Sequence, residues 1–130
     1  MKLSVFLLVA ILFSFSSRAA NVMDKWPELN EFHGVMAGTF HPSEDGNLAP
    51  VKQRIDEFVK KAHKLAQSKI PAEFSNDKVK TSVLNLDKGA VELKKLIDTK
   101  ASDDQIKKKL SSLHDTFHEI IGACTKDHKE

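Results

Sequence analysis

The sequence contains no tyrosine and only one cysteine among its 130 residues. A single cysteine, Cys124, excludes an internal disulfide, so the fold must be stabilised by packing or by a ligand. Cys124 can then be a buried thiol, a ligand or a crosslink between two chains. Alternating apolar and polar runs and long β-branched stretches are also lacking, which argues against β-strands. The sequence therefore predicts an all-α protein.

Strong net charge is absent as well. The formal net charge is +2, and loss of the first 19 residues would remove Lys2 and Arg18 and leave a neutral chain. The remaining lysines alternate with acidic residues, which gives no basic face for a phosphate backbone. We therefore expect no nucleic-acid partner.

The first 19 residues have the pattern of a secretory signal peptide. Lys2 precedes an apolar run over 5–13, and the small residues Ser17 and Ala19 suit cleavage after Ala19. The run is too short to span a bilayer convincingly. We expect a periplasmic or secreted protein with no membrane anchor after cleavage and one domain over 20–130.

Apolar residues recur with the helical period through four segments of that domain. We predict helices over about 24–39, from 48 to just before 70, from just after 77 to 97, and from 103 to 124. Asp24 can cap the first helix, with Pro27 in its first turn, and Ser102 can cap the last. The stretch HPSEDGN, 41–47, is expected to end the first helix. Similar lengths and short connections favour an antiparallel up-down-up-down four-helix bundle.

Each predicted helix has an apolar stripe that would face the core. In the first helix the stripe consists of Leu29, Phe32, Met36 and Phe40. In the last helix it consists of Ile106, Leu110, Leu113, Phe117, Ile120 or Ile121, and Cys124. Ile70 and Phe74, in the connection between the second and third helices, are expected to cover one end of the core.

Six histidines are present, and four of them occupy related positions. His114 and His118 are four residues apart on one flank of the last helix, a spacing that can direct both imidazoles toward one metal ion. On a helical wheel, where each residue turns by 100°, His33 lies about 60° from the centre of the apolar stripe of its helix. In antiparallel neighbours, His33 would lie opposite His118, whereas His41 reaches the site only if the end of the first helix lies near His114.

These positions predict a metal site formed by His33, His41, His114 and His118. Imidazole ligands suit Zn²⁺, Cu²⁺ or Ni²⁺, so copper or zinc is expected. The alternative is that these histidines are structural or surface residues that hydrogen-bond a nearby carboxylate, here Asp115 or Glu119. The sequence leaves both interpretations open.

The segment FHEIIGACTKDH, 117–128, resembles the last helix of the cytochrome c prime class of periplasmic four-helix bundles. Those helices carry C-x-x-C-H, whose cysteines bond haem and whose histidine ligates iron. Cys124 and His128 match the first cysteine and the histidine, but Asp127 stands at the second cysteine. The resemblance therefore implies a haem motif in which one of the two thioether bonds is missing.

The chain also resembles soluble b-type periplasmic cytochromes, in which a methionine of the first helix and a histidine of the last hold an unattached haem. The resemblance implies that Met36 with His114 or His118 would bind a b-type haem. The stretches around 32–42 and 113–119 are further similar to small exported histidine-containing bundle proteins, which implies no particular activity.

The motifs of common enzymes are missing: the sequence has no nucleophile elbow, phosphate loop or H-E-x-x-H. We predict no catalytic residues. The expected function is that of an exported, non-enzymatic bundle that binds a transition metal or haem for electron transfer, storage or sensing. The alternative is a periplasmic helical adaptor without a cofactor. A homodimer is compatible with either.

Overall fold

The computed structural model describes residues 21–126, and within that range every regular element is helical. The elements are α2 (Pro27–Glu44), α3 (Ala49–Gln53), α4 (Ile55–Gln67), the 3-10 helix η1 (Ala72–Phe74), α5 (Asp77–Asp98) and α6 (Asp103–Lys126). Residues 21–25 add a further helical segment. The predicted all-α class is confirmed, although six elements are found between 27 and 126 where a simple bundle of four was expected. The predicted signal peptide, 1–19, lies outside the described residues.

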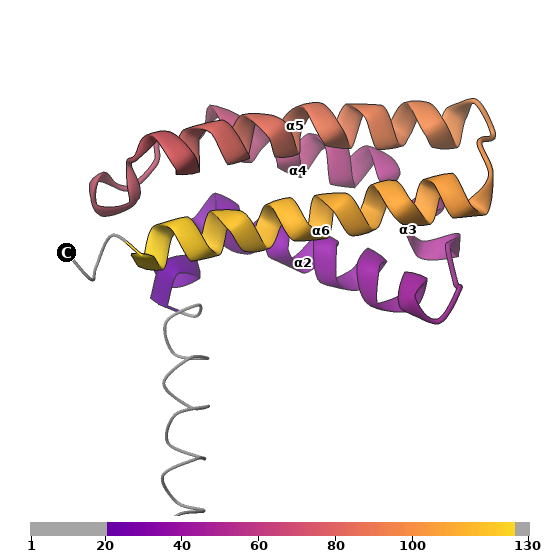
Figure 1. Cartoon of the computed structure of the whole chain (residues 1–130), viewed down its shortest axis with the longest axis horizontal. Coiled ribbons are helices and arrows are strands. Elements are labelled where there is room, and N and C mark those ends of the chain that lie inside the picture. The colour runs from indigo at the N-terminus through magenta and orange to yellow at the C-terminus, as the bar shows by residue number, and fades with distance from the viewer. Residues whose placement is uncertain (1–20, 127–130) are drawn as a thin grey trace, which may run out of the picture.

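The four longer helices are arranged in a ring around one core (Figure 1). Helices α4 and α5 lie side by side above α6 and α2 in the view of Figure 1. Helix α5 has its most extensive contacts with α6 and then with α4, while α2 contacts α4 more than it contacts α6. The weaker contact between α2 and α6 leaves part of the histidine-bearing flank of α6 near the surface.

Side-chain caps begin the two longest helices, and the cap at Ser102 is the one that the sequence predicts. The Asn76 carboxamide oxygen accepts a hydrogen bond from the Val79 amide at 2.9 Å at the start of α5. At the start of α6, the Gln105 amide donates to Ser102 Oγ at 3.2 Å, and the Ser102 amide donates to Gln105 Oε1 at 3.1 Å. This reciprocal pair satisfies two amides that have no partner within the helix.

Helix α2 differs from its prediction at both ends. Trp26 rather than Asp24 occupies the N-cap position, although Pro27 is in the first turn as expected. At the other end the helix continues through Pro42 and stops at Glu44, inside the 41–47 stretch that was expected to end it but beyond the expected last residue, 39. Ser43, which is 1 % exposed, donates its hydroxyl to the Phe40 carbonyl oxygen. The additional turn, in which Ser43 is the buried residue, carries α2 beyond its predicted end.

The second predicted helix is divided at Arg54, which separates α3 from α4. The Arg54 guanidinium donates two hydrogen bonds to the Glu57 carboxylate, from Nε at 3.1 Å and from Nη2 at 3.0 Å. It also lies directly against Gly38 of α2, where a Cβ atom would overlap it. A glycine on α2 therefore makes the space that the guanidinium occupies.

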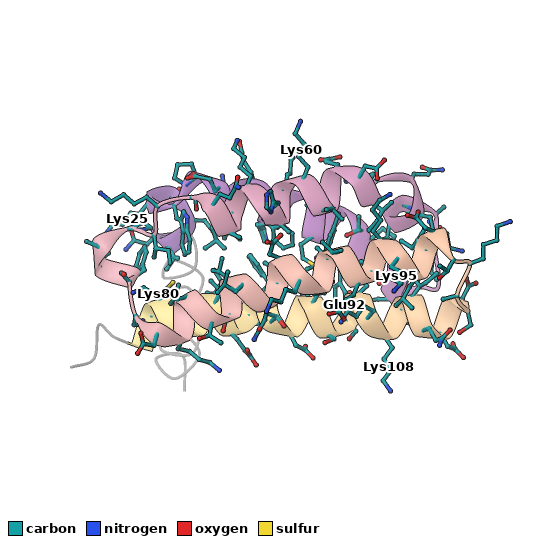
Figure 2. All side chains as sticks on the ribbon, turned by 90° about the horizontal axis from the view of Figure 1, so that it is seen from above. Lys25, Lys60, Lys80, Glu92, Lys95 and Lys108 are labelled. Atoms are coloured by element: carbon teal, nitrogen blue, oxygen red, sulfur yellow. The ribbon has the colours of Figure 1, made fainter. Side chains whose placement is uncertain are left out.

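The core follows the predicted apolar stripes closely. Its largest fully buried side chains are Trp26, Phe32, Phe58, Phe74, Leu29, Met36, Leu65, Leu86, Leu93, Ile106, Leu110 and Ile120. Phe74 of η1 is buried in the core and Ile70 packs against the core, so both apolar residues of this connection contact it. Figure 2 shows Lys60 and Lys108 extending from opposite sides of the bundle. Over 21–126, no helix has the length and apolar content that crossing a membrane requires.

Candidate metal-binding site on α6

His114 and His118 point toward each other from consecutive turns of α6. Their Nε2 atoms are 3.2 Å apart, and the ring centroids are 4.5 Å apart with the planes at 75°. The helix places both side chains on the flank that the four-residue spacing predicts. Two imidazole nitrogens therefore converge at one point, where they can share a proton or a metal ion.

The ring of His114 is fixed by an aromatic neighbour from α2. Phe40 stacks on it with centroids 3.7 Å apart and planes within 5° of parallel. Burial lowers the pKa of His114 from its ordinary value of 6.5, and the neighbouring His118 lowers it further, while Asp115 and Glu44 oppose the shift. His114 is therefore uncharged at neutral pH, which is the state in which an imidazole can bind a metal.

His118 is the more exposed member of the pair. The adjacent carboxylates, which the sequence offered as structural partners, have other roles. Glu119 Oε2 lies 3.8 Å from Lys78 Nζ of α5, and Asp115 acts on His114 through its charge. The closest polar partner of each histidine in this pair is accordingly the other histidine.

His41 lies at the end of α2, near the pair but turned to a different partner. Its Nδ1 is 3.1 Å from Glu44 Oε1, and both side chains are largely exposed. Both charges bear on the pKa of His114, so this end of α2 is close to the α6 pair. The extended α2 therefore places His41 near His114, which is one of the two arrangements that the sequence leaves open.

His33 is positioned by a different aromatic residue. Its ring stacks on Phe117 with centroids 5.6 Å apart and planes at 24°. The pairs His33–Phe117 and Phe40–His114 together show that α2 and α6 are antiparallel neighbours, with levels close to the expected ones. His33 thus reaches the level of His118 but packs on the residue before it.

The other predicted ligands lie in the core or outside the described residues. Met36 is 1 % exposed and Cys124 is fully buried. Burial of Cys124 agrees with a packed thiol rather than a crosslink on the surface. Asp127 and His128, which complete the resemblance to a haem motif, lie outside the described residues. Within 21–125, no three His, Cys, Asp or Glu side chains are grouped so that they could hold a metal ion.

A shallow groove of about 650 Å³ lies beside the histidine pair. Its walls come from the start of α5 and the outer surface of α6: Asn76, Lys78, His114, Asp115, His118, Glu119, Gly122 and Ala123. The Asn76 side-chain amide donates to the Ala123 carbonyl oxygen at 3.4 Å, which links two residues of the wall. Neither the helix-capping role of Asn76 nor its place in this groove was predicted from the sequence.

No family model, no curated protein and no solved structure matched the chain in our comparisons. The fold and the site therefore define the class of protein: an all-helical bundle with a pair of converging histidines on its last helix. What the structure shows is an all-helical bundle, and the comparisons identify no family for it.

Proposed function

We propose that the protein is an exported, non-enzymatic bundle that binds a copper or zinc ion through His114 and His118. The observation that carries this proposal is the 3.2 Å separation of the two Nε2 atoms. With metal–nitrogen bonds of 2.0–2.1 Å, two nitrogens of a tetrahedral ion stand about 3.3 Å apart. The separation of the two nitrogens is therefore close to the one that a tetrahedral ion requires.

The surroundings of the two histidines favour binding of a metal ion over sharing of a proton between the two rings. His114 is uncharged at neutral pH because its pKa is lowered, so a lone pair is available without loss of a bound proton. The stacked Phe40 ring restricts the rotation of His114 and reduces the entropy lost when a ligand binds. Imidazole nitrogens suit both Cu²⁺ and Zn²⁺, and Cu²⁺ binds such ligands more tightly.

A metal ion fits these residues better than a haem does. Haem ligation by Met36 would require a thioether that now lies in the core, on α2, at 1 % exposure. The groove beside the two histidines is bounded by α5 and α6, and Met36 is not part of its wall. A haem held by Met36 and either histidine would therefore have to displace core side chains.

Calorimetric titration of Cu²⁺ and Zn²⁺ into the purified protein tests the proposal. The variant with both His114→Ala and His118→Ala should lose binding, while His63→Ala should bind as the wild type does. His63 is a suitable control because it is an exposed histidine of α4 that is 3.3 Å from Asp87. Equal binding by the double variant and the wild type would rule out this site.

A further inference from the structure

We infer that a second copy of this chain completes the metal site, so that one ion joins two molecules through His114 and His118 of each. The inference rests on the proposed function, because it concerns the ligands that the same ion lacks. It goes further by naming the partner, which is an identical chain, and the surface, which is the outer flank of α6.

The first argument is the shortage of ligands within one chain. Zinc held by protein alone takes four ligands, and the histidine pair supplies two. Over the described part of the chain, no third His, Cys, Asp or Glu joins them in a metal-binding group. Two other candidates on this flank have partners of their own: His41 lies 3.1 Å from Glu44, and Glu119 lies 3.8 Å from Lys78.

The second argument is the accessibility of the pair from outside. Phe40 covers one face of the His114 ring, while His118 is exposed. One turn beyond His118, Gly122 has no side chain, and an added Cβ there would meet nothing within 4 Å. The row His114, His118 and Gly122 therefore gives another helix room to approach the two Nε2 atoms.

The third argument is symmetry. In a two-fold dimer the same surface meets itself, so each chain would contribute an identical pair of imidazoles and the ion would have four nitrogen ligands. The groove carries both signs of charge, Lys78 beside Asp115 and Glu119. Two copies of this surface can therefore face each other with acids near lysines rather than with one charge repelling itself.

The test is the molar mass of the intact protein in solution, measured by light scattering with a chelator and then with Zn²⁺. We expect a monomer with chelator, and with Zn²⁺ a doubling of mass at one ion per two chains. His118→Ala should remain monomeric with Zn²⁺. A monomer that binds one ion per chain would overturn the inference but leave the proposed function standing, whereas a chain that binds no ion would overturn both.

A substitution that keeps both histidines locates the interface. Gly122→Leu should still fold, since its side chain enters open space, but it should obstruct the approaching helix and prevent the doubling of mass. Gly34→Leu is the matched control, because Gly34 is an exposed helical glycine of α2 with the same open surroundings. It should dimerise like the wild type. Unchanged dimerisation of Gly122→Leu would show that the two chains do not meet on this flank.

Discussion

The ring of Phe40 lies flat against the ring of His114, with the centroids 3.7 Å apart and the planes within 5° of parallel. This contact joins the end of α2 to the flank of α6. It exists because α2 continues through Pro42, which keeps Phe40 on a helical turn facing its neighbour. The orientation of the metal-binding imidazole thus depends on a residue from another helix.

Replacement of Phe40 by alanine should weaken metal binding and raise the pKa of His114. Burial is the main cause of the lowered pKa, and loss of the stacked ring admits water, which moves the pKa back toward 6.5. Replacement of a fully buried phenylalanine by alanine lowers the free energy of unfolding by about 3–5 kcal/mol. Phe40 is only partly buried, so the loss of stability should be smaller. An NMR titration of the histidine rings measures the pKa.

Phe40→Leu is the control for that change. Leucine keeps apolar volume over His114 but cannot stack, so the pKa should rise less than in the alanine variant, while metal affinity should still fall. If metal affinity is the same in both variants and in the wild type, Phe40 does not position His114.

Glu57 should make the stability of the protein fall in acid. Hydrogen bonds from Arg54, and then from Lys61, lower the pKa of Glu57 from 4.5 to about 2. Since the pKa is lower in the folded state, the ionised carboxylate stabilises the fold above about pH 4.5. That contribution disappears as the pH falls from about 4.5 to about 2.

Urea unfolding of the wild type and Glu57→Gln across this pH range checks the prediction. The wild type should be more stable at neutral pH, and the difference should shrink as the pH falls toward about 2. A difference that does not vary with pH would mean that the carboxylate has the same pKa in the folded and unfolded chains.

Gly89 and Gly34 should respond in opposite ways to alanine. Alanine favours a helix by about 1 kcal/mol over glycine, which should stabilise Gly34→Ala, where the new Cβ meets nothing within 4 Å. At Gly89 the new Cβ would overlap Leu113 of α6, which is 2 % exposed and cannot move into solvent. Overpacking costs about 1–3 kcal/mol, so Gly89→Ala should be less stable than the wild type. Denaturant midpoints of the two variants measure this, and stabilisation by Gly89→Ala would contradict the close contact of α5 and α6.

The parts of the fold that the sequence predicts well are governed by neighbours in the chain. The predicted cap, Ser102, lies three residues from the amide that it satisfies, and the core stripe of α6 follows from a 3.6-residue period. The continuation of α2 through Pro42 and the division at Arg54 depend on tertiary contacts. Local preferences do not include such contacts, so a simple four-helix bundle was the expectation.

For the candidate site too, the sequence predicts the features set by helical spacing but not those set by contacts between helices. The spacing of His114 and His118 places both on one flank, which the sequence predicts, but the approach of their Nε2 atoms depends on side-chain rotation. The stacking residue, Phe40, was assigned to the core stripe and is only partly buried. The separation of His33 from the pair follows from its contact with Phe117, which helical periodicity cannot reveal.

The most direct test of the central claim is the long-range proton–nitrogen NMR spectrum of the histidine rings during a Zn²⁺ titration. The account predicts that the Nε2 signals of His114 and His118 shift together and reach saturation at the same Zn²⁺ concentration, while those of His33 and His63 stay in place. Saturable shifts at other histidines, with His114 and His118 unchanged, would contradict it.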